Sequence, residues 1–422
     1  MSSDWALKTL GEFCPFKYGK GLPERDRKPG AYGVFSSAGL VGSHEAAYVN
    51  SPGVVIGRKG TVGSVTYSSG PFWPIDTAFY VEDQPNIRDI RFTYYLLKTL
   101  NLHSMNTDSA VPGLNRDNAH ALEVRVPPVS VQKSIADFLQ QLDDRINLLR
   151  ETNTTLEAIA QALFKSWFVD FDPVHAKMQG RAPEGMDQAT AALFPDSFEE
   201  SELGALPKGW SISSVADVAE IIKGKSYSSK DLVAQNTTAL VTLKSFERGG
   251  GFRMDGFKPY SGTFKPTQVV TPGDLIVAYT DVTQAAELIG KPAIVVGIEE
   301  HDTLVASLDV GIVRPDFLKC GRQFLYGLFS TDSFQSHTLA HTSGTTVLHL
   351  SKDGVGSYRF PLPSFGVISG FEKIASDLAK RRQTNSDQIR TLSALRDTLL
   401  PRLISGELRI SDTAKHAEGA RT

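Results

Sequence analysis

Cationic side chains stand in glycine-rich loops, where they could contact a polyanion. The segment IGRKGTVGSV (56–65) places Arg58, Lys59 and Thr61 between glycines at the end of a predicted strand. Glycine permits a tight turn and a close approach of the backbone to a ligand, so this loop could carry two cations toward a phosphodiester chain. Arginine and lysine bind phosphates and guanine edges, and threonine can assist them. These residues therefore favour nucleic-acid binding.

Similar cations recur in other loops. These loops are KYGKGLPERDRKPG (17–30), IKGKSYSSK (222–230) and KSFERGGGFR (244–253). Their candidate contacts are Lys20, Arg25, Arg27, Lys225, Tyr227, Lys244, Arg248 and Arg253. Any one of these cations alone is more simply explained as a solvated surface charge. The pairs Gly19-Lys20 and Gly224-Lys225 favour a functional role, because both halves of the chain place a cation after the same glycine-containing strand.

Patterns typical of catalytic sites are absent from the sequence. It contains no G-x-x-x-x-G-K-[ST] loop, no G-x-G-x-x-G, no G-x-S-x-G, no Asn/Asp-Pro-Pro-aromatic motif and no E-x-K. His337 and His341 have a metal-like spacing, but no cysteine or carboxylate cluster accompanies them, so packing or surface histidines are expected. Asp172 and His175, beside a proline, are better explained by a turn cap than by acid–base chemistry. We expect a chain with no catalytic residues, no metal and no cofactor of its own.

Length and composition indicate a globular protein of two or three domains. The 422 residues are 41% hydrophobic and 22% charged, and no apolar run reaches membrane-spanning length. There is no signal-peptide pattern, and Cys14 and Cys320 are the only cysteines, so a cytoplasmic location is expected. The net charge of −3 means that DNA binding would depend on a few placed cations and on help from partners.

The middle of the chain recurs at its end. The matched segments are 5–20 with 210–225, 51–56 with 271–276, 109–118 with 345–354, and 127–168 with 363–404. The last pair aligns without a gap at an offset of 236 residues (363 minus 127). We therefore expect two similar halves that meet two similar partners or sites. The extra residues of the second half fall in loops, where related domains diverge.

The matched segments 131–168 and 363–404 are predicted to be long helices. Their apolar residues alternate steps of four and three, which is typical of a coiled-coil seam. The predicted seam comprises Ile135, Leu142, Leu149, Leu156, Leu163, Trp167, Leu378, Leu392, Leu399 and Leu403. Asn153, Arg382 and Asn385 also occupy seam positions. They either fix the register of the pair, or they are partly exposed or contact another subunit.

The remaining parts of each half are predicted to form compact mixed sheets. Short runs rich in valine, isoleucine and aromatic residues are bounded by glycine, proline and serine, and one short amphipathic helix is expected in each half, at 91–101 and 322–334. The expected fold class is α+β, with two similar mixed-sheet domains joined by two long antiparallel helices. The predicted boundaries are 1–127 and 204–363 for the sheet domains, 128–170 and 364–410 for the helices, 171–203 for a connector and 411–422 for a disordered tail.

Several longer segments carry a resemblance to a known family. They are FSSAGLVGSH (35–44), SPGVVIGRKGTVGSV (51–65), FWPIDTAFYV (72–81), SAVPGLNR (109–116), VPPVSVQKSIADFL (126–139), SWFVDFDPVHAKMQGRAPEGM (166–186) and LRDTLLPRLISGELRI (395–410). Together with the internal repeat, these segments cover nearly the whole chain. The chain resembles the specificity subunit of a type I restriction–modification enzyme.

The resemblance implies two target recognition domains, each of which reads one half of a bipartite site in double-stranded DNA. It implies paired helices that relate the halves by a pseudo-twofold axis, set the spacing between half-sites and dock two methyltransferase subunits. Two motor–nuclease subunits would join for restriction. S-adenosylmethionine, ATP and Mg²⁺ are expected on these partner subunits and not on this chain. No base assignment follows from the resemblance, and the second domain lacks the cations of the 58–63 loop.

Two other interpretations remain open. The chain could be a scaffold whose helices bridge two partner proteins without any reading of DNA. It could also be a specificity chain that serves a methyltransferase with no nuclease attached.

Overall fold

The computed structural model describes residues 5–105, 113–254, 256–283, 285–297 and 300–410. The chain folds as two compact units. Unit 1 comprises residues 1–150 and 386–422, and unit 2 comprises residues 151–385. The predicted disordered tail (411–422) lies outside the described residues. Within those residues, no helix is long and apolar enough to cross a membrane.

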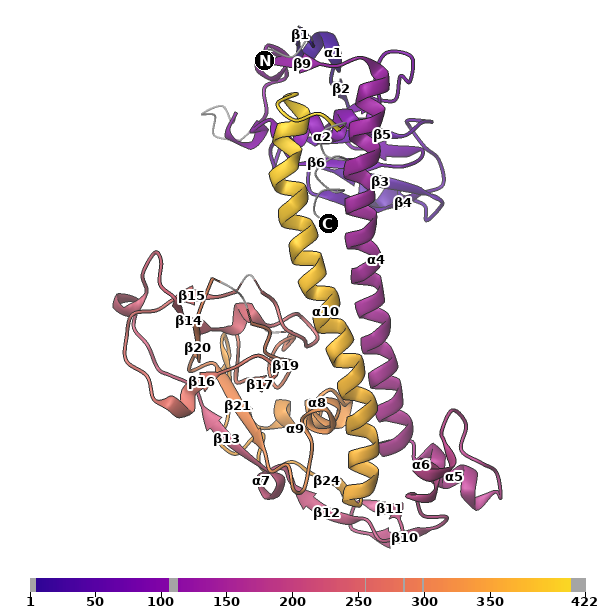
Figure 1. The fold of residues 1–422 in the computed structure, drawn as a ribbon, viewed down its shortest axis with the longest axis vertical. Helices are drawn as coiled ribbons and strands as arrows, with labels where there is room; N and C mark the ends of the chain where they lie inside the picture. Colours follow the sequence, from indigo (N-terminus) through magenta and orange to yellow (C-terminus); the bar gives the residue numbers. More distant parts are fainter. Residues whose placement is uncertain (1–4, 106–112, 255, 284, 298–299, 411–422) are drawn as a thin grey trace, which may run out of the picture. The chain divides into compact units, whose positions relative to one another are not determined.

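Strands make up much of unit 1 (Figure 1). They are β1 (Ala6–Thr9), β2 (Lys17–Tyr18), β3 (Tyr32–Ser36), β4 (Gly39–His44), β5 (Gly53–Gly57), β6 (Val65–Ser68), β7 (Phe72–Pro74), β8 (Ala78–Glu82) and β9 (Glu123–Val126). One sheet has the order β2-β8-β5-β6 and is antiparallel, while the other has the order β4-β3-β7, with β3 parallel to β7. β1 and β9 form a separate antiparallel pair.

The four-stranded sheet carries the core of unit 1. All five residues of β5 are buried, as expected for a central strand that is covered on both faces. Helix α2 (Ile90–Thr99) packs against β5 and β6 and confirms the helix predicted at 91–101. The carboxylate of Asp89 caps this helix by accepting hydrogen bonds from the backbone N–H groups of Arg91 and Phe92, at 3.0 and 2.9 Å.

Unit 2 is also built on strands. They are β10 (Phe198–Ser201), β11 (Gly204–Pro207), β12 (Ser211–Ser214), β13 (Ala219–Lys223), β14 (Thr238–Val241), β15 (Lys258–Pro259), β16 (Val269–Val270), β17 (Leu275–Ala278), β18 (Thr280–Asp281), β19 (Pro292–Ile294), β20 (Thr303–Ala306), β21 (Val310–Pro315), β22 (Thr342–Ser343), β23 (Leu348–Leu350) and β24 (Arg359–Leu362). The main sheets have the orders β13-β21-β17-β19 and β15-β14-β20-β16.

The two units share a strand order. The antiparallel sheet β13-β21-β17-β19 of unit 2 repeats the arrangement β2-β8-β5-β6 of unit 1. The second sheet of each unit holds one parallel pair, β3–β7 in unit 1 and β14–β20 in unit 2. The antiparallel pair β1–β9 has its counterpart in β12–β24. This agreement is what two similar halves require, and mixed sheets with helices place the protein in the α+β class.

A short helix follows β1 in unit 1 and follows the counterpart of β1, β12, in unit 2. In unit 1 it is α1 (Leu10–Phe13), which begins at the capping box of Thr9 and Glu12. In unit 2 it is α7 (Val215–Val218), which begins at a capping box formed by Ser214 and Asp217. In such a box, a hydroxyl and a carboxylate each accept a backbone N–H that the first helical turn leaves unpaired. A capping box therefore begins the short helix at the equivalent position in both units.

The single helix predicted at 322–334 is wrong. The structure has two helices there, α8 (Arg322–Phe329) and α9 (Asp332–Ala340). The break falls at Thr331, whose hydroxyl accepts a hydrogen bond from the backbone N–H of Phe334 at 3.3 Å and so starts a new helix. Apolar residues continue on both sides of Thr331, so the sequence pattern gives no sign that one helix ends and another begins there.

The two long predicted helices are confirmed as α4 (Val129–Phe168) and α10 (Phe365–Ile404), each 40 residues long. Their first residues differ by 236 (365 minus 129), as do their last (404 minus 168). Each helix contributes to both units. In unit 1, Asp143 of α4 pairs with Arg396 of α10, so the two helices are neighbours there. In unit 2, Glu157 pairs with Arg382 and Phe164 contacts Phe371, so rising residue numbers on α4 meet falling numbers on α10 and the helices are antiparallel.

The segment 171–203, predicted to be a connector, folds onto unit 2. It contains α5 (Asp172–Met178), α6 (Gln188–Ala192) and β10, the first strand of the β10–β11 hairpin. Val174 and Phe194 are buried in the main hydrophobic core of this unit. The proline and acidic residues of the segment suit its turns, while its few apolar side chains anchor it.

Candidate nucleic-acid interface

Two arginines flank one tyrosine at the edge of the main sheet of unit 1. Tyr18 ends β2, and its residue is 49% exposed. The guanidinium carbon of Arg58 lies 5.1 Å from the centre of the Tyr18 ring, and that of Arg116 also lies at 5.1 Å. A cation over an aromatic face is held by the quadrupole of the ring, which leaves N–H groups at the edge of the guanidinium for other partners. We call Tyr18, Arg58 and Arg116 the arginine–tyrosine cluster.

The backbone around Arg58 is held from several sides. Its N–H donates to Thr77 O at 3.0 Å, its carbonyl accepts from the N–H of Leu114 at 2.9 Å, and its side-chain Nη1 donates to Asp76 O at 2.9 Å. Lys59 forms an isolated antiparallel bridge with Gly113. Arg58 therefore starts from a fixed position, so little conformational entropy is lost when its guanidinium binds a ligand.

Glycines shape the loop that follows. The N–H of Gly57 donates to Ser64 O, and the N–H of Gly63 donates to Gly57 O, each at 2.8 Å. A Cβ at Gly57 would lie 2.0 Å from Thr61 O, and Gly60 and Gly63 have φ values of +80° and +73°. Only glycine fits such a turn, so the sequence pattern reflects the tight loop that presents Arg58, Lys59 and Thr61.

Arg116 is supplied by a third element, the short helix α3 (Arg116–His120). The side chain of Asn115 caps this helix by accepting hydrogen bonds from the N–H groups of Asp117 and Asn118, at 2.9 and 3.1 Å. Arg116 also contacts the exposed carboxylate of Asp117 at 3.4 Å. The arginine–tyrosine cluster thus joins three elements that are far apart in the sequence: β2, the end of β5 and α3.

Lys20 belongs to a second aromatic group. Its ammonium lies 5.5 Å from the ring centre of Tyr48 and 5.7 Å from that of Trp73. The indole N–H of Trp73 donates to the carbonyl of Lys20 at 2.8 Å, which fixes the backbone at that point. No carboxylate pairs with Lys20, Arg58 or Lys59 among the described residues, so their charges are available to an anion.

Two other candidate residues of unit 1 have a different setting. Arg25 is exposed and lies 3.8 Å from the carboxylate of Asp26. Arg27 donates from Nε to Leu22 O at 3.3 Å and from Nη1 to Val41 O at 3.2 Å, which ties its loop to β4. Arg27 therefore has a structural role that its sequence context does not reveal.

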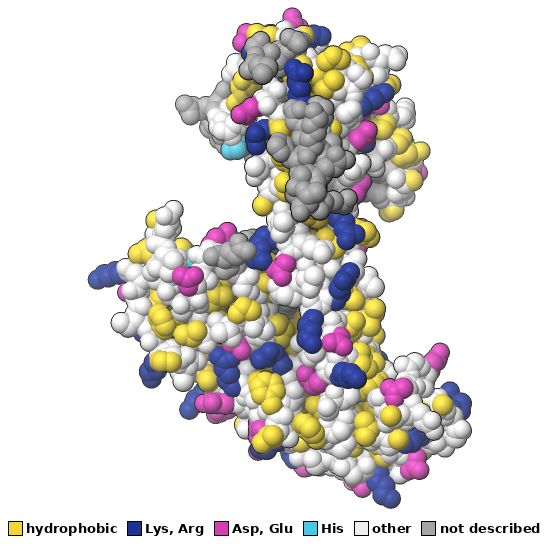
Figure 2. Space-filling model, in the orientation of Figure 1, with side chains coloured by type: hydrophobic (Ala, Val, Ile, Leu, Met, Phe, Trp, Pro, Cys, Tyr) yellow, Lys and Arg dark blue, Asp and Glu magenta, His cyan; other side chains and the backbone are white. Residues whose placement is uncertain are grey.

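The candidate residues of unit 2 are less concentrated. Lys244 is exposed, Arg248 pairs with Glu287 at 3.3 Å, and Arg253 lies 4.0 Å from Glu247. Carboxylate partners neutralise part of the charge of both arginines. The face of the molecule in Figure 2 likewise shows Lys and Arg interspersed with Asp and Glu and not gathered into one basic stripe.

Lys225 and Tyr227 lie in the segment that directly follows β13. The ammonium of Lys258 stands 5.7 Å from the ring centre of Tyr227 and 3.4 Å from its hydroxyl. Lys225 is partly buried, and its N–H donates to Ala306 O at 2.7 Å. Lys258, Arg116 and Tyr18 were not among the residues predicted from the sequence, because stacking between a cation and a ring depends on chain segments that meet only after folding.

The glycine–lysine pairs have the same backbone setting in both units. A Cβ at Gly19 would lie 2.1 Å from Ile75 O, and a Cβ at Gly224 would lie 2.0 Å from Ser307 O. The N–H of the following lysine donates to a neighbouring carbonyl in each case, at 2.9 Å for Lys20 and 2.7 Å for Lys225. The two lysines therefore leave the ends of equivalent strands along the same backbone path.

The histidines with metal-like spacing are engaged with each other and with the protein. The rings of His337 and His341 lie 4.1 Å apart, Nε2 of His337 contacts the hydroxyl of Ser357 at 3.2 Å, and Nδ1 of His341 contacts His337 O at 2.8 Å. Burial, with a smaller contribution from His341, lowers the pKa of His337. Across the described ranges, no three His, Cys, Asp or Glu residues gather as a metal site.

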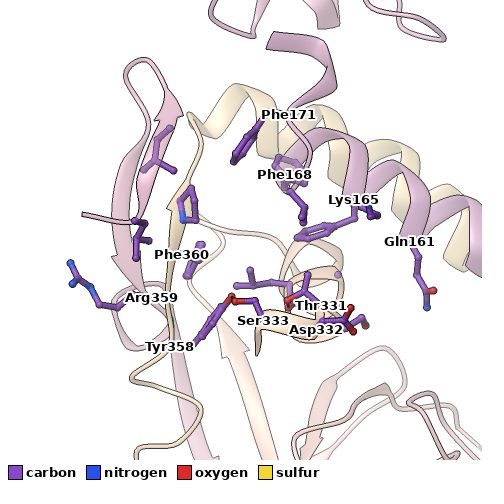
Figure 3. A pocket seen from close by; sticks show the side chains of 18 of the residues that line it. Gln161, Lys165, Phe168, Phe171, Thr331, Asp332, Ser333, Tyr358, Arg359 and Phe360 are labelled. Atoms are coloured by element: carbon purple, nitrogen blue, oxygen red, sulfur yellow. Dashed lines mark hydrogen bonds between the residues drawn. The ribbon is translucent and has the colours of Figure 1, made fainter. Parts of the chain in front are cut away.

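Unit 2 contains a hollow of about 550 Å³ beside the C-terminal end of α4 (Figure 3). Aromatic side chains, including Phe168 and Phe171, line it, together with the start of α9. The cations at its rim are paired, Lys165 with Asp170 and Arg359 with Glu202. The hollow is therefore apolar with a neutralised rim, and it does not suit a phosphate.

The predicted seam residues face the interior of the chain. Ile135, Leu149, Trp167 and Leu403 are buried, and the other six predicted seam residues are partly buried. Asn385 is fully buried, and its amide donates to Asn153 Oδ1 at 2.9 Å. The polar seam residues thus pair with each other inside unit 2, which favours the register interpretation. The exposed large apolar side chains of the helices are others: Val131, Leu148, Ile159, Phe365, Ile374 and Leu395.

Comparisons with known proteins agree with this arrangement. Residues 2–158 match the family model of the type I restriction modification DNA specificity domain. The type I restriction enzyme HindI specificity subunit of Haemophilus influenzae is 26% identical over 384 residues, which cover 79% of this chain and 81% of that protein. The MjaIX specificity subunit of Methanocaldococcus jannaschii is 23% identical over 329 residues, with coverage of 76% and 69%.

A solved structure has a similar fold. The type I restriction–modification S subunit from M. genitalium superimposes with a TM-score of 0.56 at 15% identity and covers 95% of this chain and 96% of that one. The predicted resemblance to type I restriction–modification specificity subunits is therefore confirmed.

Proposed function

We propose that this chain is the non-catalytic DNA-recognition subunit of a type I restriction–modification complex, in which each unit reads one half of a bipartite site. The observation that carries the proposal is the shared strand order of the two units, in which the equivalent strands β2 and β13 are each followed by a glycine and a lysine, at Lys20 and Lys225. Two recognition units with the same strand order suit a DNA target made of two separate half-sites.

The long helices provide the proposed spacer. At 1.5 Å per residue, 40 residues span roughly 60 Å. The helices carry ion pairs and hydrogen bonds across their seam in both units, so their register is defined. A continuous pair of helices with a fixed register can hold two readers at a constant separation.

Two methyltransferase subunits are the proposed helix partners. Ile159 and Leu395 are exposed by 48% and 44%, and their positions differ by the repeat offset of 236 (395 minus 159). Equivalent exposed apolar residues suit two copies of one partner, while the seam residues are occupied within the chain. Two motor–nuclease subunits would complete the restriction complex, and S-adenosylmethionine, ATP and Mg²⁺ would bind to these partners.

The proposed partners would also compensate for the low positive charge of this chain. A net charge of −3 with mixed surface charges provides limited attraction for a polyanion, so the methyltransferase subunits would supply much of the phosphate neutralisation. The reduced thiols Cys14 and Cys320, both buried and unbridged, suit the cytoplasm, where such a complex would meet DNA.

The proposed function can be tested by removing the two positive charges of the loop that follows β5. The double variant R58Q/K59Q, assembled with the methyltransferase partner, should bind a specific duplex about 10-fold or more weakly, because two phosphate or base contacts are lost. The matched control is K8Q/R125Q, which removes two exposed cations from the β1–β9 pair of the same unit. Unchanged DNA affinity in R58Q/K59Q, with assembly intact, would favour the scaffold interpretation.

A further inference from the structure

The strand correspondence identifies the residue of unit 2 that takes the place of Arg58. In unit 1, the carbonyl of Arg58 accepts a hydrogen bond from the N–H of Leu114, and in unit 2 the carbonyl of Tyr279 accepts one from the N–H of Leu350. Leu114 and Leu350 differ by the repeat offset of 236 (350 minus 114). Tyr279 therefore occupies the backbone position of Arg58.

The same comparison gives the counterpart of Tyr18. Tyr18 is the last residue of β2 and pairs with Phe79 of β8. Lys223 is the last residue of β13 and pairs with Gly311 of β21. Each is followed by the glycine whose Cβ would collide with the neighbouring strand. Lys223 therefore stands where Tyr18 stands in unit 1.

The counterpart of Arg116 follows from the same hydrogen bond. Arg116 lies two residues after Leu114, and Lys352 lies two residues after Leu350. An aspartate follows each of these cations, Asp117 in unit 1 and Asp353 in unit 2. The arginine–tyrosine cluster of unit 1 is thus replaced in unit 2 by Lys223, Tyr279 and Lys352. The aromatic and cationic residues are exchanged at the positions of Tyr18 and Arg58, while the position of Arg116 stays cationic.

Tyr279 fills the space that the Arg58 side chain occupies in unit 1. Arg58 lies over Tyr18 and Phe79, at 5.1 and 5.9 Å from their ring centres. In unit 2, a Cβ at Gly311 would lie 2.2 Å from Cε2 of Tyr279, so the tyrosine ring covers this glycine. Tyr279 is only 6% exposed, whereas Lys223 and Lys352 are exposed and have no ion-pair partner within the described ranges.

We propose that the arginine–tyrosine cluster of unit 1 selects bases, whereas Lys223 and Lys352 of unit 2 hold DNA phosphates without selecting a sequence. This inference rests on the proposed function. An arginine supported by an aromatic face presents a planar fork that can donate two hydrogen bonds to O6 and N7 of guanine. A lysine ammonium on a flexible stem is a point charge that suits a phosphate oxygen and carries little base information.

The decisive experiment uses the full-length chain in complex with its methyltransferase partner and a random-sequence duplex library as the probe. The variant K223Q/K352Q should lower the slope of log Kobs against log salt concentration by about 2, since about 0.9 is lost for each phosphate contact. Its selected sequences should match those of the wild type. The control K208Q/K265Q removes two exposed lysines of unit 2 that lie outside the candidate loops, and it should change neither property.

The complementary variant is R58K/R116K, which keeps the charge but loses the guanidinium fork. It should retain the salt slope, while base preference in one half-site is lost and the other half-site is unchanged. An unchanged salt slope in K223Q/K352Q, or unchanged base preference in R58K/R116K, would overturn the inference while the proposed function stands. A wild-type complex that selects no sequence would instead overturn the proposed function.

Discussion

Gly19 and Gly224 show how closely each unit packs behind its candidate contacts. A Cβ at either position would lie within about 2.1 Å of a backbone carbonyl, Ile75 O for Gly19 and Ser307 O for Gly224. Ile75 and Ser307 directly follow β7 and β20, and their backbone is held by hydrogen bonds to Phe35 O and Val241 O, so these oxygens cannot move aside as a flexible side chain does. This close approach fixes the backbone from which the next residue, a lysine, extends. The glycine therefore positions the lysine without contacting a ligand itself.

Alanine at these positions should destabilise the protein. G19A and G224A should each lower the free energy of unfolding by about 1–3 kcal/mol, because the added methyl group forces the strands apart. Gly70 provides the control, since a Cβ there meets no atom within 4 Å. Urea denaturation of the three variants checks this, and a G19A curve that coincides with that of G70A would contradict the packing argument.

Glu372 caps a helix from a distance. Its carboxylate on α10 accepts a hydrogen bond from the backbone N–H of Phe324 at 2.6 Å, at the start of α8, where Gly321 offers no side-chain cap. Burial raises the pKa of Glu372, and the hydrogen bonds from α8 oppose the shift. Because the folded state holds the proton more tightly than the unfolded state, stability from this group is present at low pH and lost as pH rises through the folded pKa.

Two substitutions separate the cap from the charge. E372A should cost about 1–2 kcal/mol at every pH, because the N–H of Phe324 loses its acceptor. E372Q keeps an acceptor and removes the ionisation, so it should be more stable than the wild type at pH 7. That advantage should shrink toward about pH 4, where the wild-type carboxyl is protonated. A constant difference between E372Q and wild type from pH 4 to 7 would show that Glu372 does not titrate with a raised pKa.

At the residue scale, the sequence indicated which cations could contact DNA but not which side chains and carbonyls surround them in the fold. Arg58 was predicted from its glycine-rich loop, since glycine spacing is a local signal. Its neighbours Tyr18 and Arg116 lie 40 and 58 residues away along the chain (58 minus 18 and 116 minus 58), so only the fold brings them together. Arg27 was predicted as a contact on the same local grounds, yet its guanidinium holds the carbonyls of Leu22 and Val41.

At the element scale, the two long helices carry similar polar triads. In unit 1, the hydroxyl of Tyr95 donates to Asp143, which also pairs with Arg396 at 2.7 Å. In unit 2, Tyr326 donates to Glu157, which pairs with Arg382. Both carboxylates are on α4 and both arginines are on α10. This distribution favours pairing of α4 with α10 over pairing of either helix with its own copy, which would place like charges together.

Double-mutant cycles test the contribution of these pairs. D143N/R396Q and its single variants should give a coupling energy of about 1–3 kcal/mol, because both side chains are largely buried, at 17% and 20% exposure. The exposed pair Asp377–Lys380, at 69% and 78% exposure, is the control and should give less than about 0.5 kcal/mol. Equal coupling in the two cycles would show that the seam pair contributes nothing specific.

The elements were predictable to different degrees. The long helices were predicted closely because a heptad pattern is a local property that repeats over many turns. The strand order was not predictable, since pairs such as Gly53 with Glu82 depend on contacts across the chain. The break between α8 and α9 was missed because the capping hydroxyl of Thr331 lies within an otherwise continuous apolar pattern.

At the scale of the whole molecule, the helices should act as a ruler. Four residues inserted after Arg150 in α4 and four after Asn385 in α10 fall at the boundaries between the units, so the contacts within each unit are kept. The added turn is roughly 6 Å long. The gap between half-sites should lengthen by one or two base pairs while both half-sites stay the same, and sequencing of methylated adenines in cells that express the variant measures this. An altered half-site would count against the ruler.

The central claim is that two similar units read two separate stretches of DNA. Footprinting of the wild-type complex with its methyltransferase partner on its own modified site tests this claim most directly. The account predicts two short protected base patches, with intervening bases whose identity is free. A single continuous patch with specific bases throughout would contradict it.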